Sequence, residues 1–148
     1  MPPATSRLAT ALSILALAAV SSAASAAEAA DHTYKATLSG EQETKGGDPD
    51  GTGTVTVTVS SGLDKLCYDV GGIENLSPIT AAHIHKAAAG QDGPPVLTLE
   101  AAEDGGFKGC VKGPEWLPDA VASGFAGYYV NVHTGDYPAG AIRAQLGS

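Results

Sequence analysis

Hydrophobic and polar residues alternate along most of the chain after residue 30. The stretch GTGTVTVTVS shows this most clearly, because Val55, Val57 and Val59 would share one face of an extended chain while threonines occupy the other. A period of two residues is typical of an antiparallel strand with one buried face. The pattern predicts strands near residues 33–39, 53–60, 64–71, 79–86, 95–100, 107–112, 126–133 and 140–146.

Turn-forming segments rich in glycine and proline, such as KGGDPDG and AGQDGPP, separate these strands. Helical periodicity is nearly absent, and only EWLPDAVASG (115–124) predicts a short helical segment, placed at one end of the sheet structure. Many short strands without alternating helices predict an all-β fold. We expect an antiparallel Greek-key β-sandwich or barrel with one short helical segment.

The N-terminal segment differs from the rest of the chain. One basic residue, Arg7, precedes an uncharged apolar run from Leu8 to Val20, and small residues follow up to Ala26. This order is typical of a secretory signal peptide, so we predict a signal peptide over 1–26, cleaved after Ala26 or, alternatively, after Ala27 or Ala30. Thirteen apolar residues are fewer than the roughly 20 needed to cross a bilayer, which argues against a membrane anchor.

Cleavage would leave one domain, residues 27–148, which is enough chain for a single core. We expect this domain in the periplasm or outside the cell, with no membrane insertion after signal cleavage. The full chain has a formal charge of -8, and loss of Arg7 with no acid makes the mature domain more acidic still. An acidic chain without a lysine and arginine cluster does not suit nucleic-acid binding.

Two cysteines, Cys67 and Cys110, remain in the exported part. An even number of cysteines in an oxidising compartment predicts a disulfide bond. A bridge between positions so far apart would stabilise the fold by roughly 3 to 4 kcal/mol in the chain-entropy model. A pair of metal thiolates is the less favoured alternative, because neither cysteine has a histidine or second cysteine nearby in the sequence.

The segment TAAHIHKAAAG carries two of the four histidines. In a strand, His83 and His85 project from one face, with Cα atoms about 6.5 to 7 Å apart. Ala82 and Ile84 take the opposite face, and Ile84 is the natural core residue, so both histidines are expected to point away from the core. Two imidazoles so placed can converge on one ion at about 2.0 Å from each nitrogen.

The segment YYVNVHT repeats this arrangement near the C-terminus. Val130 and Val132 form its apolar face, which places Tyr129, Asn131 and His133 on the outward face. If the two strands are neighbours, His83, His85 and His133 can share one metal site. The alternative is that they are ordinary strand histidines on a solvated face.

Three imidazoles without thiolates suit Cu(II) or Zn(II), and copper leads in the Irving–Williams order. We therefore expect copper, as Cu²⁺ or Cu⁺, with zinc as the alternative. Three ligands leave a coordination position open. An outward site without a covering layer would exchange its metal easily, and two chains of a homodimer could share it.

Several blocks of the sequence resemble the CHRD domain, a module named from chordin and common in secreted bacterial proteins. They are LSGEQE, TAAHIHKAAAGQDGPPVLTL, GCVKG and YYVNVHTGDYPAGAIRAQLG, and the resemblance covers about residues 33–147. It implies an extracellular module, and Glu43 as a further ligand or a residue behind the ligands. The chain departs from the family pattern after Glu43, where TKGGDP replaces the usual prolines.

The chain is also faintly similar to copper/zinc superoxide dismutase, which has an H-x-H strand and a later strand ending in V-x-V-H. This likeness implies a superoxide-dismutase-like sandwich, with an immunoglobulin-like one as the alternative, and His83, His85 and His133 as copper ligands. It also implies that Arg143, facing outward between Ile142 and Ala144, guides an anion. However, no fourth strand histidine is expected that could bridge to zinc, and no histidine-rich, aspartate-containing zinc loop is present.

These observations favour an exported copper-binding protein that captures or handles copper or uses it in redox chemistry. Glu43, Tyr129 and Arg143 are candidates for an additional ligand or for support behind the three histidines. Two alternatives remain open: a metal-free extracellular interaction module of the chordin type, and a copper-only oxidoreductase resembling superoxide dismutase. Catalysis itself is left open by the sequence.

Overall fold

Eight antiparallel strands form one sheet in the computed structural model, which describes Met1 and residues 30–147. Residues 2–26 of the predicted signal peptide and the favoured cleavage site after Ala26 fall outside the described residues. The strands are β1 (His32–Ser39), β2 (Thr52–Val59), β3 (Lys65–Glu74), β4 (Ile79–Lys86), β5 (Pro95–Thr98), β6 (Phe107–Lys112), β7 (Tyr128–Thr134) and β8 (Ile142–Gln145). A 3-10 turn, η1 (Gly40–Gln42), follows β1, and a short helix, α1 (Leu117–Ala122), precedes β7.

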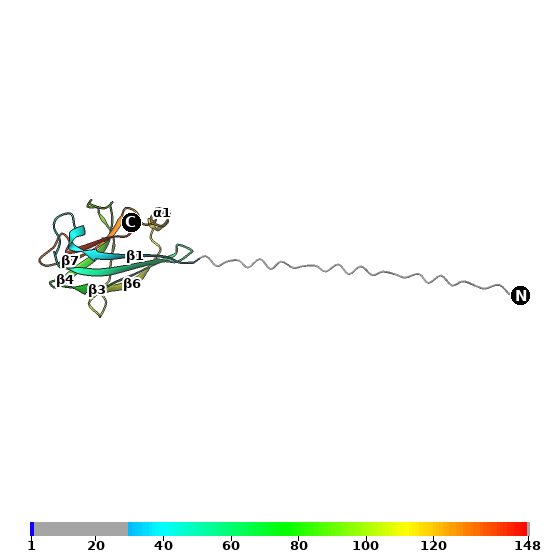
Figure 1. Cartoon of the computed structure of the whole chain (residues 1–148), viewed down its shortest axis with the longest axis horizontal. Coiled ribbons are helices and arrows are strands. Elements are labelled where there is room, and N and C mark those ends of the chain that lie inside the picture. Colours follow the sequence, from blue (N-terminus) through cyan, green and yellow to red (C-terminus); the bar gives the residue numbers. More distant parts are fainter. Residues whose placement is uncertain (2–29, 148) are drawn as a thin grey trace.

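The sheet has the strand order β5-β4-β7-β8-β1-β2-β3-β6 and curls into a half-barrel (Figure 1). The segment after β5 crosses the gap between the two edges of the sheet. Leu99 donates its backbone N–H to Ala82 of β4 over 2.9 Å, and Lys108 of β6 donates to Glu100 over 3.1 Å. These bonds connect β4, which lies next to the edge strand β5, with β6, the strand at the other end of the order.

The predicted all-β antiparallel fold is confirmed, and each predicted strand overlaps an observed one. The strands form one curled sheet, which corresponds to the predicted barrel and not to a sandwich of two separate layers. β3 runs to Glu74, beyond the expected end, because an irregularity in its pairing with β2 at Thr52 and Thr54 accommodates Gly72 at a φ of 58°. β5 ends earlier than predicted, where the chain leaves β4 for β6.

The inner face of the half-barrel carries the hydrophobic core. Val55, Val57 and Val59 are at most 1% exposed, as their alternation predicted. α1 closes one end, where its buried Leu117 and the following Phe125 join the core. The C-terminal end of the chain lies beside α1 (Figure 1). The predicted helical cap is therefore confirmed.

The predicted disulfide is present. Cys67 on β3 and Cys110 on β6 lie directly opposite each other and are bonded, at a sequence separation of 43. The bond fastens β6, an edge strand, to its only neighbour in the strand order. Among the described residues no cysteine is free, so the thiolate alternative has no support.

Within the described part of the chain, no helix is long and apolar enough to cross a membrane.

Replacing both cysteines, Cys67→Ala with Cys110→Ala, is expected to lower the free energy of unfolding by about 4 kcal/mol, because the unfolded chain regains the entropy of an open loop. Urea denaturation of the oxidised protein and the double variant measures the difference. Thr58→Ala, beside Cys67 on β2, is the control and should have a much smaller effect. Equal stability of the oxidised protein and the double variant would contradict the expectation.

Candidate metal centre

The three predicted histidines meet on the outer face of two neighbouring strands. His83 and His85 lie on β4 and His133 lies on β7, and β4 pairs with β7. In this register His83 faces Asn131, and His133 faces Ala81, so His133 is diagonal to His83. Ala82 and Ile84 point into the core, as do Val130 and Val132. The alternation therefore placed the three histidines on the correct face.

The imidazole nitrogens of these histidines form a compact group. One donor atom from each residue lies within 4.8 Å of the others, and His83 Nδ1 is 3.1 Å from His133 Nε2. The ring centroid of His83 lies 5.5 Å from that of His85 and 5.0 Å from that of His133. Among the described residues this is the one group of three or more histidine, cysteine or acidic side chains close enough to hold an ion.

Backbone carbonyls set the protonation of two of the rings. His85 Nδ1 is 2.8 Å from the carbonyl oxygen of Gly93, and His133 Nδ1 is 3.1 Å from that of Pro138. Since a carbonyl oxygen can only accept, both Nδ1 atoms carry the proton and both Nε2 atoms keep a lone pair. Metal-binding histidines in proteins are oriented by hydrogen bonds of this kind.

Two of the free lone pairs have unusual surroundings. His85 Nε2 is buried and has no hydrogen-bond partner among the described residues. His133 Nε2 faces His83 Nδ1, which must carry a proton to make a hydrogen bond between them. For His83 to bind a metal through Nδ1, this proton must move to its Nε2, which keeps the ring neutral and leaves Nδ1 with a lone pair.

Burial favours the neutral form of the rings. Desolvation lowers the pKa of His83, and the nearby His133 and His85 lower it further. Desolvation also lowers the pKa of His133, against the opposing effect of its hydrogen bond to Pro138. Both rings are therefore held toward the form that ligates a metal.

Loops cover part of the outer face, which differs from the expectation of an uncovered site. His85 is only 8% exposed, because residues 87–94 fold back over β4. Gly93 allows this close approach, since a Cβ at that position would collide with the carbonyl of Lys86. Asp92 links this loop to a second loop, because it accepts a hydrogen bond from the Thr44 hydroxyl and forms a salt bridge with Lys45. His83 and His133 remain partly exposed, so the group is open on their side.

Tyr129 is buried under the same loop, beside the candidate ligand His85. Its ring stacks on His85, with centroids 4.8 Å apart and an angle of 11° between the planes. Its hydroxyl accepts a hydrogen bond from the backbone N–H of Gly93 over 3.3 Å. The structure thus places Tyr129 behind His85, where it packs against the imidazole.

Arg143 also points outward from β8, but loops bury it to 1% exposure. Its guanidinium donates to the carbonyls of Gln91 and Ala88 and to the side-chain oxygen of Gln145, at 2.9 to 3.1 Å. It also lies 3.5 Å from the centre of the Tyr129 ring. A guanidinium engaged in this way is not available to guide an anion, in contrast to the role implied by the likeness to superoxide dismutase.

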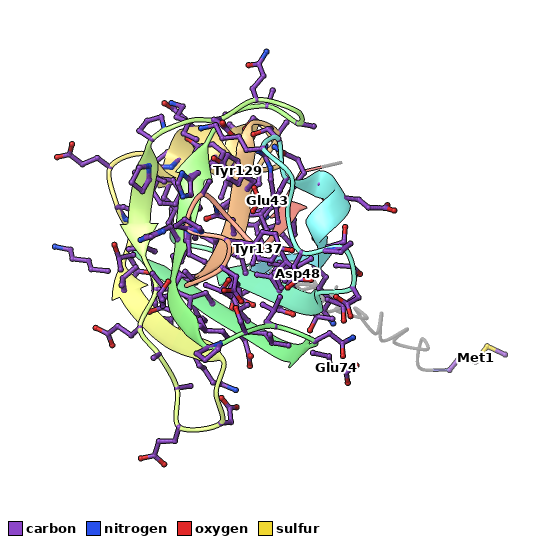
Figure 2. All side chains as sticks on the ribbon, turned by 90° about the vertical axis from the view of Figure 1, so that its left-hand side faces the viewer. Met1, Glu43, Asp48, Glu74, Tyr129 and Tyr137 are labelled. Atoms are coloured by element: carbon purple, nitrogen blue, oxygen red, sulfur yellow. A yellow bond between two sulfur atoms is a disulfide. The ribbon has the colours of Figure 1, made fainter. Side chains whose placement is uncertain are left out.

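Glu43 is not a member of the close group of donor atoms. Its carboxylate packs on the backbone of Gly140, where a Cβ would overlap both oxygens. Burial raises the pKa of Glu43 to about 7, although the charge of Arg143 and a hydrogen bond from Asn131 oppose the rise and Asp92 adds to it. Figure 2 shows the labelled Glu43 and Tyr129 on the same side of the molecule, and Arg143 acts on both.

The sequence did not identify the carbonyls of Gly93 and Pro138 that orient the rings. A backbone carbonyl is present in every residue, so its role cannot be predicted from residue type. The glycine and proline content of the loops that contain Gly93 and Pro138 was the one indication that the backbone approaches other groups closely there. Alternation in β7 predicts that Asn131 points outward but assigns it no role, and in the structure it is 2% exposed. It lies between the histidine group and the Glu43 and Arg143 pair.

A family model for the CHRD domain matches residues 34–146. The chain belongs to the CHRD-domain family. No curated protein and no solved structure gives a significant match. The match extends from β1 to just beyond β8, so the CHRD domain contains the three histidines, both loops that cover them and the disulfide.

Glu43→Gln should stabilise the CHRD domain more at pH 8 than at pH 5. The folded-state pKa of Glu43 is about 7 against 4.5 for the free side chain, so the folded state binds the extra proton between these values. The stability associated with that proton is full below pH 4.5 and is lost as the pH rises through about 7. Glutamine removes this loss because it never ionises.

Urea unfolding of the parent and the variant at both pH values tests this expectation. Glu41→Gln is the matched control, since Glu41 is an exposed carboxylate on η1. The prediction is wrong if Glu43→Gln changes stability equally at pH 5 and pH 8.

Proposed function

We propose that this CHRD domain is an exported copper-binding module in which His83, His85 and His133 hold one ion. The observation that carries the proposal is the convergence of three imidazole nitrogens within 4.8 Å, two of them on rings oriented by carbonyls. The buried, unpartnered Nε2 of His85 supports it, because a buried acceptor without a partner costs roughly 1 to 3 kcal/mol unless a ligand satisfies it.

The spacing of the donors fits one ion after a small adjustment. Two nitrogens at about 2.0 Å from a metal lie at most about 4 Å apart. The widest pair in the group lies within 4.8 Å, so an ion would draw the rings together by up to about 1 Å. Rotation of the partly exposed His83 supplies such a movement, whereas His85 is held by its loop.

Copper is the preferred ion and zinc the alternative. Neutral imidazoles suit both ions, and the Irving–Williams order places Cu(II) above Zn(II) for the same ligands. Three histidines leave a position for water, for a donor from a second chain or for a molecule that receives the metal. The opening beside His83 and His133 favours capture or delivery of copper, and two copies of the chain could share the ion there.

Export agrees with two features of the chain. The first 26 residues have the composition of a signal peptide, and the Cys67–Cys110 bond requires an oxidising compartment to persist. We therefore propose that the protein is periplasmic or secreted.

Copper binding is favoured over superoxide dismutation by the arrangement of Arg143. All of its observed hydrogen bonds go to a loop and to Gln145. The resemblance to copper/zinc superoxide dismutase implies that Arg143 attracts the anion. In this structure the Arg143 side chain is buried. The domain is also acidic overall, which does not favour attraction of superoxide.

Metal analysis, copper titration and EPR of the exported, untagged protein test the proposal. We expect one Cu(II) per chain with nitrogen hyperfine structure, and retention of copper after dialysis. His133→Ala, or His83→Ala with His85→Ala, should abolish the retention without unfolding the domain. His32→Ala is the matched control, because this fourth histidine is exposed on β1 and lies outside the group.

The proposal fails if the parent retains no copper or zinc, or if the histidine variants bind as well as His32→Ala. The histidine group would then be a hydrogen-bonded feature of a metal-free interaction module. A rate of superoxide removal well above that of aqueous copper would instead favour the oxidoreductase.

A further inference from the structure

We infer that Arg143 is a positioning residue that fixes the imidazole of His85 through the loop of residues 87–93. The inference deepens the proposed function, since its consequence for copper rests on His85 being a ligand. Its structural part concerns the metal-free protein and stands on its own contacts.

The orientation of His85 depends on one atom of this loop. His85 Nδ1 donates to the carbonyl of Gly93 over 2.8 Å, which leaves Nε2 with a free lone pair and no hydrogen-bond partner among the described residues. If Gly93 moved away, the proton could transfer to Nε2, and the ring would lose the lone pair that binds a metal.

Arg143 on β8 binds the same loop through its guanidinium group. One guanidinium nitrogen donates to Gln91 O and the other to Ala88 O, at 2.9 and 3.1 Å. Gln145 accepts from Arg143 and donates to Ala87 O over 3.0 Å, which adds a third attachment. The side chain is 1% exposed, so these bonds are shielded from water.

Tyr129 connects the two ends of this arrangement. Its strand, β7, lies between β4 and β8, so its ring has His85 on one side and Arg143 on the other. Its hydroxyl accepts from Gly93 N, the same residue whose carbonyl orients His85. Arg143 therefore supports His85 both through the loop and through the stacked ring.

The planar guanidinium is specific for this role. It presents donors in a rigid fork that reaches two carbonyls while lying flat on an aromatic ring, whereas a lysine ammonium is a compact charge on a flexible stem. Arg143→Lys keeps the charge but is expected to lose at least one carbonyl and the stacking. This difference makes lysine the informative substitution.

The primary experiment is NMR of the metal-free, ¹⁵N-labelled protein. In the parent we expect His85 as a single Nδ1–H tautomer whose ring proton exchanges slowly with water. In Arg143→Lys that signal should broaden or disappear, with faster exchange of the amides of residues 87–93 and an otherwise native spectrum. Copper titration should then show a dissociation constant about 10- to 100-fold higher, the usual cost of losing support behind a ligand.

A second pair of variants covers the case in which Arg143→Lys does not fold. Asp92→Asn weakens the exposed edge of the same loop, where Asp92 contacts Lys45 at 3.1 Å and Arg143 at 3.8 Å. It should accelerate exchange of the His85 ring proton by a smaller factor. Asp69→Asn is its matched control, because it breaks the exposed pair with Lys108 on β6, away from the loop.

Unchanged tautomer and exchange of His85 in folded Arg143→Lys, or in Asp92→Asn, would overturn the inference. Failure of the parent to bind copper or zinc would overturn the proposed function alone, because the NMR comparison needs no metal. Loss of the His85 signal in Arg143→Lys but not in Asp69→Asn would support the positioning role.

Discussion

The pairing of β4 with β7 is the constraint on which the site depends. Its register sets His133 diagonally across from His83 and sets Tyr129 beside His85. A shift of one residue would turn one strand's polar side chains into the core. The core prevents such a shift, because Ile84 and Val130 face each other and are completely buried. The same packing that stabilises the half-barrel thus fixes the distance between the candidate ligands.

The outer face over β4, β7 and β8 is a second, polar layer of the domain. Tyr129, Asn131 and Arg143 are each at most 3% exposed although they point away from the core. Burying such groups is costly unless they are hydrogen-bonded or paired. Arg143 is satisfied by loop carbonyls, whereas His85 Nε2, Glu43 Oε1 and Asn131 Oδ1 have no partner among the described residues. Two further buried atoms without a partner, Ser77 Oγ and Tyr128 OH, belong to other residues, so three of the five such atoms in the described part of the chain belong to His85, Glu43 and Asn131. Each unsatisfied buried group needs an explanation, and an absent ligand is one.

The arginine illustrates why similar motifs need not have similar roles. In this CHRD domain, Arg143 lies on β8, the strand that follows β7. The loop after β4 encloses its side chain, and its guanidinium stacks on the ring of Tyr129. Its charge faces Asp92 at 3.8 Å, and it opposes the raised pKa of Glu43. Its position therefore suits support of the ligand layer better than contact with an incoming anion.

Alternation along the chain by itself determined the strands, the inward valines and the outward face of His83, His85 and His133, because side-chain direction in a strand follows from local geometry. The two cysteines likewise predicted a disulfide, which the structure contains. Only the tertiary structure decided that β4 and β7 are neighbours, that the strands form one curled sheet and that loops cover His85. These features depend on contacts between segments distant in the sequence and on backbone carbonyls such as Gly93 O. The role of a backbone carbonyl cannot be predicted from the type of its residue.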